Sequence, residues 1–224
     1  MLARPLDFSL QAQRLNVPFL EAAVLREVLP RLTPQEIAQL LYLWILEGIP
    51  HAFIQYPMLY GSLRNWLAKR FDVPERNVTL VGSARIGFSL KEFGRPFNTK
   101  SDLDFALVSE PWFNKLEDDF LSWKSDFEHE RIQPSTIEKR FWVDNLSRVP
   151  ENIRRGFITA NDLPNRYQNK QEVANAMWMI HQKLQSTPGA PNFKKATIRI
   201  YRDWDSLVNQ NTLNLFVISK ALTA

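Results

Sequence analysis

Two aspartates at alternate positions, Asp102 and Asp104, are the residues of this chain best suited to chemistry. They begin a run from Asp102 to Val108 that predicts a strand, and successive side chains of a strand point to opposite faces. Both carboxylates are therefore expected on one face, with Leu103 and Phe105 on the other. Neighbouring like charges repel each other, but oxygen ligands of this kind are what Mg²⁺ binds. The pattern predicts a site for Mg²⁺ or Mn²⁺; the alternative is a pair of solvated carboxylates on an edge strand.

A glycine–serine turn, Gly82-Ser83, directly follows a second expected strand over residues 78–81. A turn of this kind presents free backbone N–H groups and a hydroxyl, which suit a phosphate. The helix expected after it, over residues 84–90, would point its N-terminus at the same place, and helix N-termini favour anions. The loop 91–100 then carries basic residues that either reach a phosphate or are ordinary surface charges. The candidate cofactor-binding residues are Gly82, Ser83, Arg85 and Lys100.

Together these features resemble the nucleotidyltransferase superfamily that includes the polymerase-beta-type enzymes. The resemblance is carried by Gly82-Ser83 and by Ser101-Asp102-Leu103-Asp104, and it is specific over residues 78–108. Asp102 follows Ser83 by 19 positions, which is longer than in compact members of the superfamily. The surplus falls in the loop 91–100, and loop insertions of this kind cost little free energy.

The resemblance implies a Mg²⁺-dependent nucleotidyltransferase that moves an NMP group from an NTP, with ATP the expected donor, to an acceptor. RNA, a protein side chain or a second nucleotide would each serve as that acceptor. Because small bacterial relatives act in toxin–antitoxin and phage-defence systems, the resemblance also implies antiviral defence as a setting. In the two-metal mechanism, one ion would orient the triphosphate and the other would activate the attacking hydroxyl.

A third carboxylate, on a strand beside the Asp-x-Asp strand, completes the two-metal site in this superfamily. The candidate is Asp203, which follows an alternating run over residues 196–202 and is expected on the same face as Arg199. The implied catalytic residues and metal ligands are then Asp102, Asp104 and Asp203. If no acid is correctly placed, the alternative is a catalytically inactive member of the fold that acts as a nucleotide sensor or as a binding subunit for a protein partner. The rival acids are Asp205, Glu128, Glu130 and Asp144.

Helical patterns dominate residues 1–72, and strand patterns begin just after them. We expect an N-terminal helical region over 1–72 and a nucleotidyltransferase-like core over 73–224, with a helical insertion at about 111–193. Strands that flank a mostly helical middle favour an α+β fold with a mixed sheet. Two capping boxes, at Thr33 and Ser135, mark helix starts. The sequence further predicts helices over 18–32, 60–71, 84–90, 112–130 and 171–185, strands over 78–81, 102–108, 156–159, 196–202 and 213–218, and turns at Asn145 and Pro150.

The composition is that of an ordinary folded protein, with 224 residues, 45% hydrophobic and 23% charged. There are no cysteines, which excludes disulfides and thiolate metal sites and fits a reducing compartment. The sequence has no signal-peptide pattern and no run of about 20 apolar residues, so we expect a cytoplasmic protein without a membrane segment. The net charge of +4 permits an anionic ligand such as ATP or RNA. Walker and Gly-x-Gly-x-x-Gly loops, a Gly-x-Ser-x-Gly elbow and the histidine spacings of metal sites do not occur in the sequence.

Overall fold

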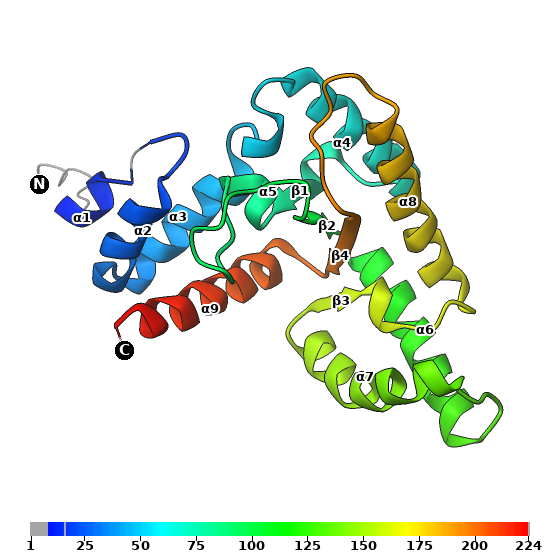
Figure 1. Ribbon diagram of the computed structural model, residues 1–224. Helices are drawn as coiled ribbons and strands as arrows, with labels where there is room; N and C mark the ends of the chain where they lie inside the picture. The colour runs from blue at the N-terminus through cyan, green and yellow to red at the C-terminus, as the bar shows by residue number, and fades with distance from the viewer. Residues whose placement is uncertain (1–8, 16, 224) are drawn as a thin grey trace, which may run out of the picture.

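The computed structural model describes residues 9–15 and 17–223 and has an α+β fold, which confirms the fold class expected from the sequence. The described part contains a four-stranded sheet with the strand order β1-β2-β4-β3 (Figure 1). Four of the five expected strands are confirmed to within one residue at each end. They are β1 (Val78–Val81), β2 (Leu103–Val108), β3 (Phe157–Thr159) and β4 (Ala196–Tyr201).

The sheet is mixed, as expected. β2 pairs antiparallel with β1 and parallel with β4, and β3 pairs antiparallel with β4. Neighbouring parallel strands need a long crossover connection. The connection from β2 to β4 contains the inserted helices α6 (Glu110–Glu128), α7 (Thr136–Arg154) and α8 (Gln168–Gln185), together with β3 and the short η4 (Ala160–Asp162). The resulting register places Asp104 between Val81 of β1 and Thr197 of β4.

Helices cover both faces of the sheet, so the sheet is the middle of three layers (Figure 1). One face packs against α4 (Pro57–Phe71), α6 and α8. The other face packs against α3 (Pro34–Leu46) and α9 (Trp204–Thr223), with α2 (Ala22–Val28) in the same cluster. The first face presents Leu80, Leu103, Phe105, Leu107, Ile198 and Ile200, and the second presents Ala106, Val108, Phe157 and Tyr201.

The N-terminal helical region contributes to both of these helical layers. α3 begins at the capping box of Thr33 and Glu36, as the sequence predicts. Ahead of it, the single helix expected over 18–32 is shorter, because α2 gives way to the 3₁₀ turn η1 (Leu29–Arg31), which contains Pro30. A proline has no N–H to continue an α-helical ladder, which is the physical reason for the change. A short helix, α1 (Leu10–Gln13), precedes α2.

α3 and α4 are joined by a sharp bend through the short turn η2 (His51–Phe53). Gly48 and Pro50, residue types that commonly end helices, lie in this bend. No single helix among the described residues has both the length and the hydropathy to cross a membrane. The segments Pro34–Phe53 and Pro57–Phe71 satisfy those criteria only as a pair, and that pair is bent by 117°.

The expected last strand over residues 213–218 is wrong, because these residues lie within α9. Leu207 and Leu215, two helical turns apart, are fully buried in the cluster that α9 shares with α3 and one face of the sheet, whereas Leu213 and Val217 are exposed. Burial in α9 therefore follows a helical period. A short apolar run cannot by itself distinguish a strand from a buried helix segment.

The turns expected at Asn145 and Pro150 are also wrong, since both residues lie inside α7. This helix begins at the expected capping box of Ser135 and Glu138. The Asn145 side chain donates a hydrogen bond to the Asp162 carbonyl at 2.8 Å, so it bonds across to η4 instead of opening a turn. The helices expected over 60–71, 112–130 and 171–185 are confirmed as α4, α6 and α8, with ends shifted by at most three residues.

Candidate functional site

The Gly82-Ser83 turn lies against the carboxylate of Asp104. β1 runs directly into Gly82, whose backbone has φ +66° and ψ −152°, a region that only glycine occupies without strain. A Cβ atom placed on Gly82 would lie 3.2 Å from Asp104 Oδ2. The turn and the Asp-x-Asp segment, which the sequence predicts as parts of one site, are therefore neighbours in space.

The helix after the turn, α5 (Ser83–Ile86), is shorter than the expected 84–90. It ends at Gly87, where φ is +96° and an added Cβ would meet the His51 ring at 2.8 Å. From Gly87 onward the chain folds back on itself, because the Phe97 N–H donates to the Gly87 carbonyl and the Ser89 N–H to the Arg95 carbonyl, both at 2.8 Å. The basic loop is thus held beside the turn by backbone hydrogen bonds.

Asp104 is fixed by its neighbours on both sides in the sheet. Its strand partners are Val81, which precedes the glycine turn, and Thr197. Thr197 Oγ1 donates a hydrogen bond to Asp104 Oδ1 at 2.6 Å. The second oxygen, Oδ2, is the one that faces the Gly82 backbone. One carboxylate oxygen is therefore committed to β4, and the other is directed at the turn.

Asp102 precedes β2 and is held more loosely. Its Oδ2 lies 3.8 Å from Lys195 Nζ, and its side chain keeps 34% of its exposure. Its Oδ1 is buried and has no hydrogen-bond partner among the described residues. A buried carboxylate oxygen without a donor is unusual, because burial of an unsatisfied polar atom costs free energy. A bound cation would satisfy that oxygen.

The environment of Asp104 disfavours its charged form. Burial raises the pKa of Asp104 above its ordinary value, the hydrogen bond from Thr197 acts in the opposite direction, and the negative charge of Asp102 raises the pKa again. Arg199, which lies on the same face of β4 as Thr197, and Lys195 lower the pKa of Asp104. A bound divalent cation would lower the pKa of Asp104, because it favours the ionised form of both aspartates.

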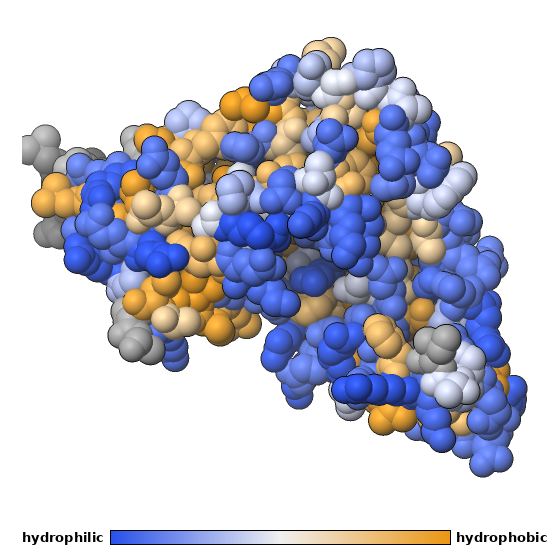
Figure 2. Space-filling view, in the orientation of Figure 1, coloured by the Kyte–Doolittle hydropathy of each residue, from blue (hydrophilic) through white to orange (hydrophobic). Residues whose placement is uncertain are grey.

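The two aspartates and the glycine turn line an open cavity of about 840 Å³, within the size range of small-molecule sites. α9 forms another wall of the same cavity. Arg95 is partly neutralised, since its Nε lies 2.8 Å from a carboxylate oxygen of Glu92. Figure 2 shows the hydrophilic surface of the basic loop beside an apolar surface over the C-terminal part of α9. The basic residues of the lining are Lys91, Arg95, Lys100 and Lys194.

The donor atoms fit one divalent ion better than two. Asp102 and Asp104 offer the oxygen ligands that Mg²⁺ and Mn²⁺ take, and phosphate oxygens and water commonly complete such a shell. Among residues 9–15 and 17–223, no group of three or more histidine, cysteine, aspartate or glutamate side chains could hold a metal. The residue of β4 beside Asp104 is Thr197, which is not an acid.

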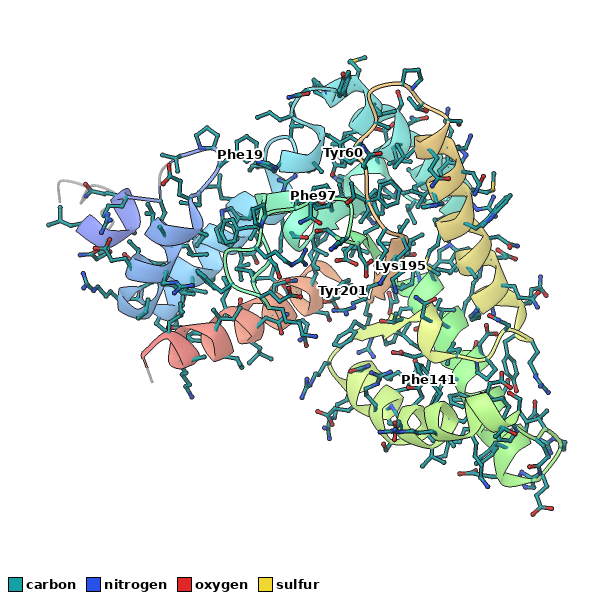
Figure 3. The ribbon with its side chains drawn as sticks, viewed as in Figure 1. Phe19, Tyr60, Phe97, Phe141, Lys195 and Tyr201 are labelled. Carbon is teal, nitrogen blue, oxygen red and sulfur yellow. The ribbon has the colours of Figure 1, made fainter. Side chains whose placement is uncertain are left out.

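Asp203 is not brought to this site. β4 lies parallel to β2, so Asp104 pairs with Thr197 near the start of β4, while Asp203 follows Tyr201 at its other end. The step from Thr197 to Tyr201 alone is about 13 Å along a strand. Figure 3 labels Lys195 and Tyr201 at the two ends of β4. The Asp203 carboxylate instead accepts the Ser206 N–H at 2.7 Å, at the start of α9.

Arg85, a candidate for phosphate binding, also points elsewhere. It is buried, and its guanidinium donates to the carbonyls of Trp44, Glu47 and Gly48 at the end of α3. Carbonyls at a helix C-terminus lack partners within the helix and attract cations. Arg85 therefore ties α5 to α3, and we withdraw it from the candidate site. Gly82, Ser83 and Lys100 do line the cavity, together with Asp102 and Asp104.

Lys195 and Thr197 contact the two aspartates directly, and neither is among the site residues expected from the sequence. A local signal for Thr197 existed, since the alternating run 196–202 places it on the same face as Arg199. Nothing local shows that this run pairs with β2, because Thr197 and Asp104 are 93 residues apart. Asn211 and Asn214 of α9 also line the cavity. Asn214 was missed because residues 213–218 were expected to form a strand, and no local pattern marked Asn211.

Comparisons of the chain with protein-family models, with curated proteins and with solved structures gave no match in any of the three. The resemblance to nucleotidyltransferases therefore remains a prediction that depends on the residues of this chain.

Proposed function

We propose that this protein binds a nucleoside triphosphate with Mg²⁺ or Mn²⁺ and transfers the nucleotidyl group to an acceptor. The observation that carries the proposal is the contact between the Gly82 turn and the Asp104 carboxylate, which unites a phosphate-type turn and two carboxylates in one cavity. The orphaned oxygen of Asp102 and the basic lining of the cavity support it. ATP is the proposed donor, and RNA, a protein side chain or a second nucleotide is the proposed acceptor, in a setting such as phage defence.

Each residue of the site has a role in this reaction. Asp102 and Asp104 would hold the divalent ion, which when bound would neutralise charge on the triphosphate and on the departing pyrophosphate. The Ser83 hydroxyl and the backbone N–H groups of the turn bind phosphate oxygens. Lys100 and its basic neighbours compensate the remaining negative charge. The acceptor hydroxyl oxygen would bond to the α-phosphorus as the bond between that phosphorus and the α–β bridging oxygen breaks; pyrophosphate would leave, and the hydroxyl proton would pass to water in the open cavity.

The test is incubation of the purified protein with labelled NTPs and Mg²⁺ or Mn²⁺, with RNA and total protein as acceptors. We expect the double variant Asp102→Ala/Asp104→Ala to lose transfer by a factor on the order of a hundred or more, because the ion contributes several kcal/mol to such a transition state. Asp118→Ala is the matched control, since Asp118 is exposed on α6 and outside the cavity. Equal transfer by the wild type and the double variant would refute the proposal.

A second function, nucleotide binding without turnover, is favoured by one observation. Thr197 occupies the β4 position beside Asp104, and the described residues supply no third acid to complete a two-metal site. A protein of this kind would act as a nucleotide sensor or as the binding subunit of a complex. Calorimetry that shows ATP binding in the presence of Mg²⁺, with no pyrophosphate released over the same interval, would select this function over transfer.

A further inference from the structure

α9 places an apolar surface inside the proposed nucleotide cavity. The helix is anchored by Leu215, which is fully buried in the cluster shared with α3. Val217 and Ile218 follow on the cavity side, and Val217 keeps 69% of its exposure. A valine exposed on the wall of a cavity gains free energy if a ligand covers it. Figure 2 shows this apolar surface beside the hydrophilic surface of the basic loop.

The cavity is therefore two-sided. The aspartates, the glycine turn and the basic loop form a polar side suited to a metal and phosphates, while α9 and Leu90 supply apolar atoms to the rest of the lining. A nucleoside triphosphate has the same division, with a charged chain at one end and a flat, largely apolar base at the other. A volume of about 840 Å³ accommodates both parts.

Two amides of α9 in the same lining have free hydrogen-bonding capacity. Asn211 Nδ2 donates to the Leu207 carbonyl at 2.8 Å, which leaves its Oδ1 as an acceptor. Asn214 Oδ1 accepts from Gln210 Nε2 at 3.1 Å, which leaves its amino group as a donor. A donor and an acceptor one helical turn apart can bond the polar edge of a base or the ribose hydroxyls.

We propose that α9 binds the nucleoside part of the ligand, with Val217 packed against the base and Asn211 and Asn214 bonded to the base edge or the sugar. This inference rests on the proposed function, since it assigns the second half of the same ligand. It makes α9 the part of the chain that distinguishes a nucleotide from an inorganic polyphosphate. The glycine turn and the aspartates bind both kinds of ligand alike.

The experiment compares ATP with inorganic tripolyphosphate, each with Mg²⁺, by titration calorimetry against the full chain. Val217→Ser should weaken ATP binding about tenfold, the usual scale for a lost apolar contact in a pocket, while tripolyphosphate affinity stays within about twofold. Leu213→Ser is the matched control, because Leu213 is exposed on the same helix one turn away and does not line this cavity. It should change neither affinity. Thermal unfolding of both variants verifies that they are folded.

The outcomes separate the two proposals. If Val217→Ser leaves ATP affinity unchanged, or weakens both ligands equally, α9 does not bind the nucleoside, while the proposed function survives because ATP still binds the wild type. If the wild-type protein binds neither ATP nor tripolyphosphate, the proposed function fails and the assignment of α9 fails with it. A selective loss of ATP affinity in Val217→Ser alone supports the inference.

Discussion

Replacing Asp104 by asparagine should stabilise the ligand-free protein and strongly reduce its stabilisation by Mg²⁺ and ATP. Asparagine keeps the shape of the side chain, and its amide oxygen can still accept the hydrogen bond from Thr197. The variant removes the carboxyl group of Asp104, whose pKa is raised first by burial and further by Asp102. A group whose ionised form is disfavoured in the folded state reduces stability wherever it is ionised.

The part of the effect that comes from Asp102 follows from the spacing of the two aspartates. Their Cα atoms lie two strand residues apart, about 6.6 Å, and two unit charges at that distance repel by about 2.5 kcal/mol at an effective dielectric constant of 20. Solvent reaches the Asp102 side chain, which is 34% exposed, and Lys195 lies 3.8 Å from it. Both screen the repulsion, so we expect a gain of about 1 kcal/mol in the free energy of unfolding. For a chain of this length, that gain raises Tm by about 2–4 °C.

The assay is thermal unfolding across a pH series, with and without Mg²⁺ and ATP. Because the folded-state pKa of Asp104 is raised, the wild type loses stability relative to Asp104→Asn as the pH rises through that value. Below the ordinary aspartate pKa of about 3.9, both side chains are neutral and the difference vanishes. ATP with Mg²⁺ at about a hundred times Kd should stabilise the wild type by about 2.7 kcal/mol and the variant by much less.

Asp102→Asn is the control for this prediction. It removes the same repulsion but also the attraction between Asp102 and Lys195, so its gain in Tm should be smaller than that of Asp104→Asn. A lower Tm for Asp104→Asn at neutral pH without ligand would refute the reasoning. That result would mean that Thr197 and Arg199 compensate the charge fully and that the carboxylate is a structural group.

Two further variants test the turn and its neighbour. Gly82→Ala should lower the free energy of unfolding by about 1–3 kcal/mol, because φ is +66° and the new Cβ would lie 3.2 Å from Asp104 Oδ2. Calorimetry should also show weaker ATP binding by this variant. Unchanged stability would contradict the geometry of the turn. Arg85→Met should lower the free energy of unfolding by about 2–4 kcal/mol in urea titrations, because it leaves carbonyls at the end of α3 without their donor. The affinity of Arg85→Met for ATP should match that of the wild type, and a selective loss of ATP binding would return Arg85 to the site.

Secondary structure predicted from patterns within short stretches of the sequence was confirmed in several places. β1, β2 and β4 follow from runs of strand-forming residues, and two helix starts follow from the capping boxes at Thr33 and Ser135, because such signals act between residues close in the chain. The resemblance also implied that the Gly82 turn lies near Asp104, and the antiparallel pairing of β1 with β2, which brings the end of β1 to the start of β2, accounts for it. The strand expected over residues 213–218 was wrong, because Leu215 is buried in the cluster shared with α3 and the segment is helical.

The sequence by itself determined the α+β class, the strands that carry the site, and the neighbouring carboxylates and glycine turn, because each depends on side-chain periodicity or on backbone preferences of nearby residues. Only the tertiary structure decided what surrounds them. The parallel pairing of β4 with β2 places Thr197 and Lys195 beside the aspartates and carries Asp203 to the far end of the strand. It also starts α9 from the end of β4, and the burial of Leu215 turns one side of that helix toward the cavity. These contacts join residues about a hundred positions apart, and their geometry is set by the packing of the whole sheet.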